Sequence, residues 1–202
     1  IKLIATNKGI GVNNNAKIVA NNDISINLNG DLINKADIAS GNSLDIKLNS
    51  LDNKNALIYA SGKANIKANN IINKDTKKNK NKGILSNNLK IDSTTLDNSN
   101  GNIISNGLLD IKIKDSLNNT LGYIGAYLDL NLNSSLLNNK DGFIISNKNL
   151  FINTDKYNNH GNLQARKNLS LITKDTIDYN GGFYANKDIF IKTTDDFINN
   201  TK

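Results

Sequence analysis

The chain has 202 residues, among them 42 Asn, and contains no Glu, Pro, Met, Trp or Cys. Without Cys it forms neither disulfides nor thiolate metal sites, and no apolar run approaches the roughly 20 residues that a membrane-spanning helix needs. The net charge of +7 comes from 24 Lys and one Arg against 18 Asp, dispersed along the chain. Because Arg, the preferred phosphate ligand, is almost absent, we do not expect nucleic acid to be a partner.

A pair of apolar residues separated by one residue recurs at nearly constant spacing. In chain order, the first residues of these pairs are Ile24, Leu44, Ala64, Leu89, Leu109, Leu130, Leu150, Leu169 and Ile189. The steps between these anchors are 20, 20, 25, 20, 21, 20, 19 and 20 residues. A fixed period of this length indicates a repeat architecture, in which each repeat buries its apolar face only against its neighbours.

Further columns keep the same period. Six residues before the anchor stand Ile18, Ile38, Ile58, Ile103, Ile124, Ile144, Leu163 and Phe183, with Ile84 one position out of step. After the anchor stand Leu32, Leu51, Ile71, Leu96, Leu117, Leu137, Tyr157, Ile177 and Phe197. An Asn corner follows at Asn34, Asn53, Asn73, Asn98, Asn119, Asn139, Asn159, Asn180 and Asn200. Apolar and polar residues alternate within each repeat, which is the periodicity of a strand with one buried face.

These columns predict an all-β fold, a right-handed parallel β-helix (solenoid) of about nine coils, each with three strands in ~20 residues. Asn suits the corners because it tolerates left-handed backbone angles, and stacked Asn side chains can exchange amide hydrogen bonds from coil to coil. The chain starts at Ile1 without a signal-peptide pattern. We therefore expect residues 1–202 to form a single β-helix segment, excised from a longer filament.

The motif of the later coils resembles a known family. Residues 141–152 and 160–171 follow the pattern G-x-I-x-A/S-x-x-x-L-x-I, with Leu accepted at the Ile positions. This resembles the filamentous haemagglutinin repeat of two-partner-secreted bacterial exoproteins, and the resemblance extends from about Ala16 to Asn200. It implies a shaft, exported through an outer-membrane transporter and displayed on the bacterial surface as a spacer, with a target-cell receptor or glycan as a partner. Adhesins and contact-dependent growth inhibition toxins share the repeat, so both remain open.

A Lys-rich segment interrupts the repeat. Residues 74–82 add about five residues between the third and fourth coils and are expected to form an exposed loop insertion. Its lysines are Lys74, Lys77, Lys78, Lys80 and Lys82. They are candidate contacts for lipopolysaccharide or another anionic glycan. The alternative is a solvated insertion without a partner, since loops on a solenoid tolerate length cheaply.

Aromatic residues concentrate in the second half of the chain, because only Tyr59 precedes Gly122. Phe143, Phe183 and Phe197 are predicted to face inward. Phe151, Ile172 and Phe190 fall on outward positions of the second strand in three successive coils. An outward apolar group needs a cover or a partner. These three residues are therefore a candidate partner contact for a receptor, the next segment or a second rod, although the segment itself is expected to be monomeric.

No catalytic or metal site is predicted, and no cofactor is expected. A Ser/His/Asp arrangement would depend on His160 alone, which lies in a corner sequence. The acidic concentration consists of Asp175, Asp178, Asp195 and Asp196, which fall on different coils. A polysaccharide-active β-helix, similar to a lyase or hydrolase, would need such carboxylates to converge with Lys or Arg. That class is kept as the alternative to a non-enzymatic shaft.

Overall fold

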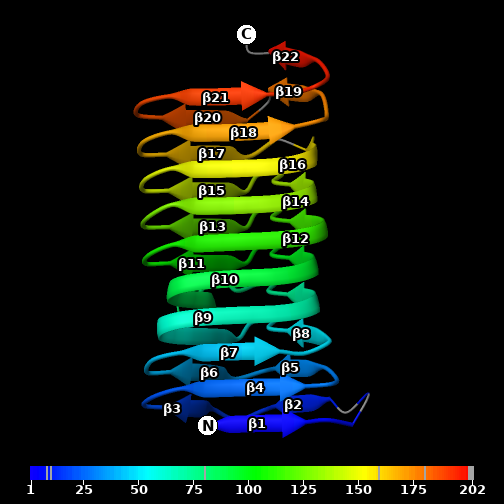
Figure 1. The fold of residues 1–202 in the computed structure, drawn as a ribbon, viewed down its shortest axis with the longest axis vertical. Helices are drawn as coiled ribbons and strands as arrows, with labels where there is room; N and C mark the ends of the chain where they lie inside the picture. Colours follow the sequence, from blue (N-terminus) through cyan, green and yellow to red (C-terminus); the bar gives the residue numbers. More distant parts are fainter. Residues whose placement is uncertain (8, 10, 80, 159, 180, 200–202) are drawn as a thin grey trace.

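The structure is a computed structural model that describes residues 1–7, 9, 11–79, 81–158, 160–179 and 181–199. The described chain contains strands and corners but no helix, and it winds into a right-handed solenoid of about nine turns (Figure 1). Every strand pairing between described residues is parallel, because each coil stacks on the same part of the coil before it. The predicted fold class is confirmed.

Each coil contributes to three walls. The first wall contains β3 (Ile18–Ala20), β6 (Asp37–Ser40), β11 (Asn102–Ser105), β13 (Tyr123–Ala126), β15 (Phe143–Ser146), β17 (Asn162–Ala165) and β20 (Gly182–Ala185). The second contains β1 (Lys2–Ala5), β4 (Ile24–Leu28), β7 (Leu44–Lys47), β18 (Leu169–Thr173) and β21 (Ile189–Lys192). The third contains β2 (Val12–Asn14), β5 (Leu32–Asn34), β8 (Ser50–Asp52), β19 (Ile177–Tyr179) and β22 (Phe197–Asn199). Longer strands turn the corners: β12 (Leu109–Asn118), β14 (Leu130–Asn138) and β16 (Leu150–Asn158) join the second and third walls, and β9 (Leu57–Ile72) and β10 (Gly83–Asp97) follow all three.

The anchor column lies inside the second wall in the predicted register. Backbone pairing aligns all nine anchors from Ile24 to Ile189 across successive coils. Eight of them are at most 3% exposed, and Ile189 is 46% exposed because no described strand of this wall lies over β21. Full burial of a Leu or Ile side chain contributes about 1.5–3 kcal/mol. The continuous apolar core is therefore the main favourable contribution to folding.

The Asn corner forms an internal ladder of amide side chains. Each Nδ2 donates to the Oδ1 of the next coil at 2.7–2.9 Å, through Asn14, Asn34, Asn53, Asn73, Asn98, Asn119 and Asn139. All seven side chains are at most 6% exposed. Because buried amides need hydrogen-bond partners, the ladder allows a polar corner to lie against the core. The predicted members Asn159, Asn180 and Asn200 lie outside the described residues.

The corner geometry explains the Gly of the repeat motif. Two positions after the ladder Asn, the backbone takes left-handed φ angles of 51–58° at Asn55, Asp75, Asn100, Leu121 and Asp141. In the coil with Leu121, the following residue is Gly122. A Cβ atom there would collide with the carbonyl oxygen of Asn98 and with Oδ1 of Asn119. The absent side chain at this position thus makes room for the amide ladder.

The Lys-rich insertion is six residues long. The corner at 73–76 matches the corner at 53–56, and β10 then pairs with β9 in register, which leaves Lys77–Lys82 as the added residues. The register of β10 against β9 shifts directly after Ser86, so the following corner is one residue shorter. A period of 20 plus six minus one gives the 25-residue step. The shorter corner also explains why Ile84 is one position out of step with its column.

Candidate contact surfaces

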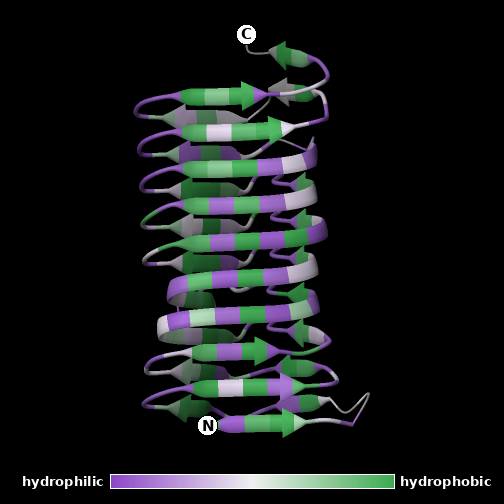
Figure 2. Ribbon diagram, viewed as in Figure 1, coloured by the Kyte–Doolittle hydropathy of each residue, from purple (hydrophilic) through white to green (hydrophobic). Residues whose placement is uncertain are grey.

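The outward side of the second wall is polar in the earlier coils and carries one apolar residue in each of the last three coils. One outward column consists of Ser25, Asp45, Asn65, Lys90, Asp110, Asn131, Phe151, Ser170 and Phe190. The other consists of Asn27, Lys47, Lys67, Asp92, Lys112, Asn133, Asn153, Ile172 and Lys192. Figure 2 shows polar residues alternating along the front strands from β4 to β14 and becoming fewer in β18 and β21.

The three predicted contact residues do not form one stripe. Phe151 and Phe190 share a column with Ser170 between them, whereas Ile172 belongs to the neighbouring column. Their side chains are exposed to 43% (Phe151), 54% (Phe190) and 40% (Ile172). Two coils separate the rings by about 10 Å along the rod, so each ring stands alone.

Phe151 and Ile172 line a shallow groove of 570 Å³ on the second wall. Leu108, which is 50% exposed, adds to the apolar lining, and Phe190 does not line the groove. The polar lining includes Asp110, Lys112, Asn131, Asn133, Asn153 and Ser170. The volume lies within the range of about 300–1,000 Å³ that ligand sites occupy. Leu108 was not among the predicted contacts, although its place directly before an inward anchor predicts an outward side chain.

Three amide side chains of the groove are available to a partner. Elsewhere on this wall, stacked polar side chains bind one another, as when Asn65 Nδ2 donates to Asp45 Oδ1 at 2.6 Å. Asn133 and Asn153 are also register partners, yet their side chains and that of Asn131 form no hydrogen bond with any described residue. The groove therefore offers free amide donors and acceptors beside an exposed aromatic ring.

The Lys-rich segment is attached to the rod by three of its lysines, among them Lys77 and Lys82. Lys82 Nζ donates to Asp37 Oδ1 at 2.8 Å, two coils back. Lys77 Nζ donates to the Leu121 carbonyl at 2.8 Å and lies 5.2 Å from the centroid of the Phe143 ring. A partly exposed ion pair or cation–π contact contributes about 0.5–1 kcal/mol. At Lys77 and Lys82 the segment therefore contacts the rod and is not a fully solvated loop, which was the alternative prediction.

The remaining lysines of the segment differ from one another. Lys78 is exposed and has no ion-pair partner among the described residues, and it borders a hollow of 620 Å³ with Lys54 and Lys82. Lys80 lies outside the described residues. Lys74 Nζ lies 3.0 Å from Asp97 Oδ2. Of the five predicted anion contacts, the structure thus leaves Lys78 free and pairs three others with the rod.

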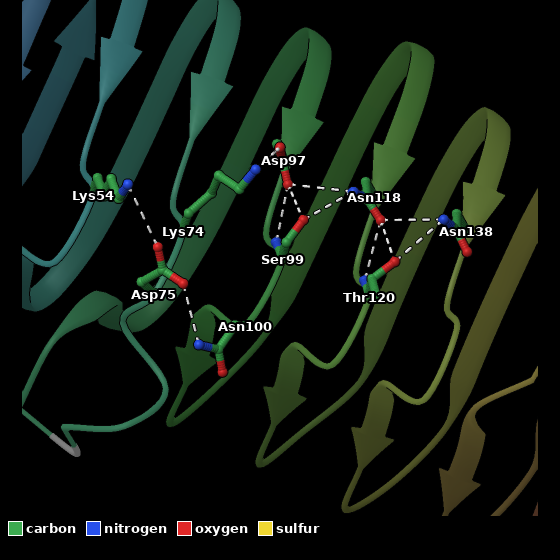
Figure 3. Close-up of polar contacts among 9 residues, drawn as sticks. All are labelled: Lys54, Lys74, Asp75, Asp97, Ser99, Asn100, Asn118, Thr120 and Asn138. Carbon is green, nitrogen blue, oxygen red and sulfur yellow. Dashed lines mark hydrogen bonds and ion pairs between the residues drawn. The ribbon is translucent and has the colours of Figure 1, made fainter.

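Lys74 belongs to a polar network on the outward side of the corners (Figure 3). Asp97 Oδ1 accepts hydrogen bonds from the N–H and the hydroxyl of Ser99. Asn118 Nδ2 donates to Ser99 Oγ at 2.9 Å, and Asn118 Oδ1 accepts from the Thr120 hydroxyl at 2.7 Å, which repeats the pattern one coil on. Burial raises the pKa of Asp97, but the bonds from Ser99 and Lys74 outweigh it and hold that pKa below its ordinary value. This network stabilises the corners from outside.

Two of the four acidic residues near the end of the chain, Asp175 and Asp195, accept hydrogen bonds in turns. Asp175 Oδ1 accepts from the Thr176 N–H at 3.1 Å, and Asp195 Oδ2 accepts from the Thr176 hydroxyl at 2.9 Å. Asp196 and His160 are exposed, and the side chain of Asp178 lies outside the described part. Within the described ranges, no group of three or more His, Asp, Glu or Cys could hold a metal ion. The same ranges contain no helix of the length and apolarity that crossing a bilayer requires.

Three Phe residues were predicted to face inward, and only Phe183 is buried. Phe183 is 8% exposed, and its ring stacks on that of Tyr157 with centroids 6.4 Å apart. Phe143 is 37% exposed, so its inward placement was wrong: Ile144 takes the inward position, and strand alternation turns its neighbour outward. Phe197 holds the predicted register but is 50% exposed, because no described coil lies over it.

These features define the class of the protein: a parallel β-solenoid built from short repeats, with an amide ladder at one corner. The family described as the haemagglutinin repeat matches residues 4–53, 39–95, 84–150 and 124–201. Since these matches cover nearly the whole chain, the chain belongs to the haemagglutinin-repeat family. Such repeats are typical of structural adhesin filaments. No similar curated protein and no similar solved structure was found.

Proposed function

We propose that this chain is a shaft segment of a larger secreted bacterial surface filament and that the groove of the second wall is its contact surface for a target-cell receptor. The haemagglutinin-repeat family and the solenoid support a filament exported through an outer-membrane two-partner transporter. Both adhesion and contact-dependent growth inhibition use such a shaft to hold a distant group away from the cell. In this proposal the segment is a spacer with one specialised face, without catalytic activity.

The change of polarity along the second wall carries the receptor proposal. Phe151 and Ile172 expose apolar surface in a groove, at positions where Asp45 and Lys67 stand in earlier coils. A pure spacer gains nothing from exposed apolar groups. A partner that covers them and pairs with the free amides would gain both apolar burial and hydrogen bonds.

The test compares variants inside and outside the groove. Phe151→Ser with Ile172→Ser should lower binding of the labelled chain to target cells by at least ~10-fold, as loss of a central contact does. Phe190→Ser is the matched control, because it exposes a similar ring outside the groove. Its binding should match that of the wild-type chain, and the melting temperature should remain nearly unchanged in both variants. Undiminished binding by the groove variant, or a large fall in its melting temperature, would end the receptor proposal.

A second contact is proposed for the Lys-rich segment with an anionic glycan. The observation in its favour is the exposed, unpaired Lys78 beside Lys54 at the mouth of the second hollow. Replacing Lys78 and Lys54 by Gln should abolish retention of the chain on immobilised lipopolysaccharide. Retention of that variant at the same salt concentration as the wild type would refute this contact.

A further inference from the structure

The outward side of the first wall carries a continuous apolar column. Its members are Val19, Ala39, Tyr59, Leu85, Ile104, Gly125 and Ile145, aligned by the parallel register of successive coils. These seven residues are called the first-wall stripe. The stripe contains no charged side chain, whereas charged residues alternate along the second wall over the same coils.

The stripe is partly accessible, since two of its members are exposed, four are half-buried and Gly125 is buried. Val19 is 55% and Tyr59 37% exposed, and Phe143 in the neighbouring outward column is also 37% exposed. The ring of Tyr123 lies over Gly125, where a Cβ atom would come within 2.6 Å of its Cε1, so an aromatic ring covers the gap in the stripe. A contiguous apolar surface of this kind marks an interaction site.

We infer that the first-wall stripe binds the same stripe on a second copy of this chain, so that two rods associate side by side. Six spacings of about 4.8 Å between the seven coils make the stripe roughly 29 Å long. A partner contacts every coil only if its own surface repeats at the same spacing. A second copy has that spacing, and contact between identical surfaces gives a closed two-fold pair.

The composition of the stripe suits such an interface. The centres of protein interfaces are poor in charged residues and rich in aromatic ones, and Tyr59 and Tyr123 supply the aromatic rings here. Lys77 and Lys82 of the insertion do not oppose contact, because Lys82 pairs with Asp37 and Lys77 is held at the Leu121 carbonyl. Pairing of the rods therefore buries apolar side chains without burying an unpaired charge.

The expected association is weak and increases with salt. The stripe is one residue wide and roughly 29 Å long, so it offers less than the ~800 Å² per partner of a standard interface, and we expect a Kd of about 0.1–1 mM. Each copy carries a net charge of +7. Salt screens the repulsion between the two rods and should strengthen an apolar contact, whereas it would weaken an ionic one.

Sedimentation equilibrium of the 202-residue chain over a range of concentrations tests the inference. The wild type should show a monomer–dimer equilibrium that shifts toward dimer as NaCl is raised to about 0.5 M. Tyr59→Asn with Ile104→Asn should weaken dimerisation at least ~10-fold. Val19→Asn, at the most exposed position of the stripe, should weaken it as well and serves if the double variant does not fold. Circular dichroism and the melting temperature monitor folding.

The matched control is Phe151→Asn with Phe190→Asn, which makes equivalent outward changes on the second wall. Its dimerisation should equal that of the wild type. The inference is overturned if the wild type stays monomeric at every concentration, if the folded stripe variants dimerise like the wild type, or if only the second-wall control loses dimerisation. Receptor binding through the groove would be unaffected by these outcomes, because the two surfaces lie on different walls.

Discussion

Replacing Asn119 by Ala would interrupt the internal amide ladder in the middle of the rod. The Asn119 side chain is fully buried; its Oδ1 accepts from Asn98 Nδ2 at 2.7 Å, and its Nδ2 donates to Asn139 Oδ1 at 2.8 Å. Its Nδ2 also donates to the Phe143 carbonyl at 3.3 Å. Ala would remove all three bonds and leave the Asn139 amide oxygen without its ladder donor in a buried corner.

The magnitude follows from these contacts. A typical hydrogen bond contributes about 0.5–1.5 kcal/mol, and a buried polar group left without a partner costs about 1–3 kcal/mol. Asn119→Ala should therefore lower the free energy of unfolding by about 3–5 kcal/mol. The matched control is Asn131→Ala, since Asn131 is exposed and its side chain forms no hydrogen bond with a described residue. That substitution should change the free energy of unfolding by less than about 0.5 kcal/mol.

Guanidinium unfolding followed by circular dichroism measures the difference between the two variants. Because a stack of coils need not unfold in one step, native-state hydrogen exchange should accompany it. We expect amide protection to fall most in the coils next to Asn119. If the two variants differ by less than about 1 kcal/mol, the hydrogen bonds of the ladder do not stabilise the rod.

Four further predictions concern the core, a buried phenol, a carboxylate and the insertion. Ile111→Asp places a charge in the core and should destabilise the rod by more than about 3 kcal/mol in urea unfolding, whereas the outward Lys112→Asp should cost less than about 1 kcal/mol. The buried Tyr157 hydroxyl has no partner among the described residues, so Tyr157→Phe should raise the melting temperature. Because the pKa of Asp97 is lowered, its ionised form adds stability that is present above pH ~4 and is lost as pH falls; Asp97→Asn should flatten this acid limb of the stability curve. Deleting Lys77–Lys82 should preserve the circular dichroism spectrum, because it restores the corner length of the other coils.

The fold could be predicted because its determinants are local and repeated. The period of about 20 residues, the inward alternation at Leu109 and Ile111, and the Asn corner are each visible many times over. A pattern that is weak within one coil becomes a strong signal because it recurs in the other coils. Phe143 was misplaced although the alternation around Ile144 predicts its outward orientation, and the same reasoning applied to Leu85 would have found the first-wall stripe.

The contacts of the insertion could not be predicted in the same way. Lys77 meets Leu121 across 44 residues of sequence, and Lys82 meets Asp37 across 45. A segment that occurs once has no column to align with, and flexible lysines can reach several coils. The groove could be predicted only in part. Phe151 and Ile172 interrupt polar columns in the sequence, but whether the two side chains line one groove depends on which outward column each occupies.

The amide ladder also gives the rod a direction. Every bond between ladder residues runs in the same sense, from the amide nitrogen of one coil to the amide oxygen of the next coil along the chain. If each side-chain amide carries a dipole of about 3.5 D, as a peptide unit does, the dipoles add from coil to coil. A coil stacked upside down, with its amide rotamer unchanged, would place nitrogen against nitrogen on one side and oxygen against oxygen on the other. The ladder thus makes the two stacking faces of a coil different, because one presents an amide oxygen and the other an amide nitrogen.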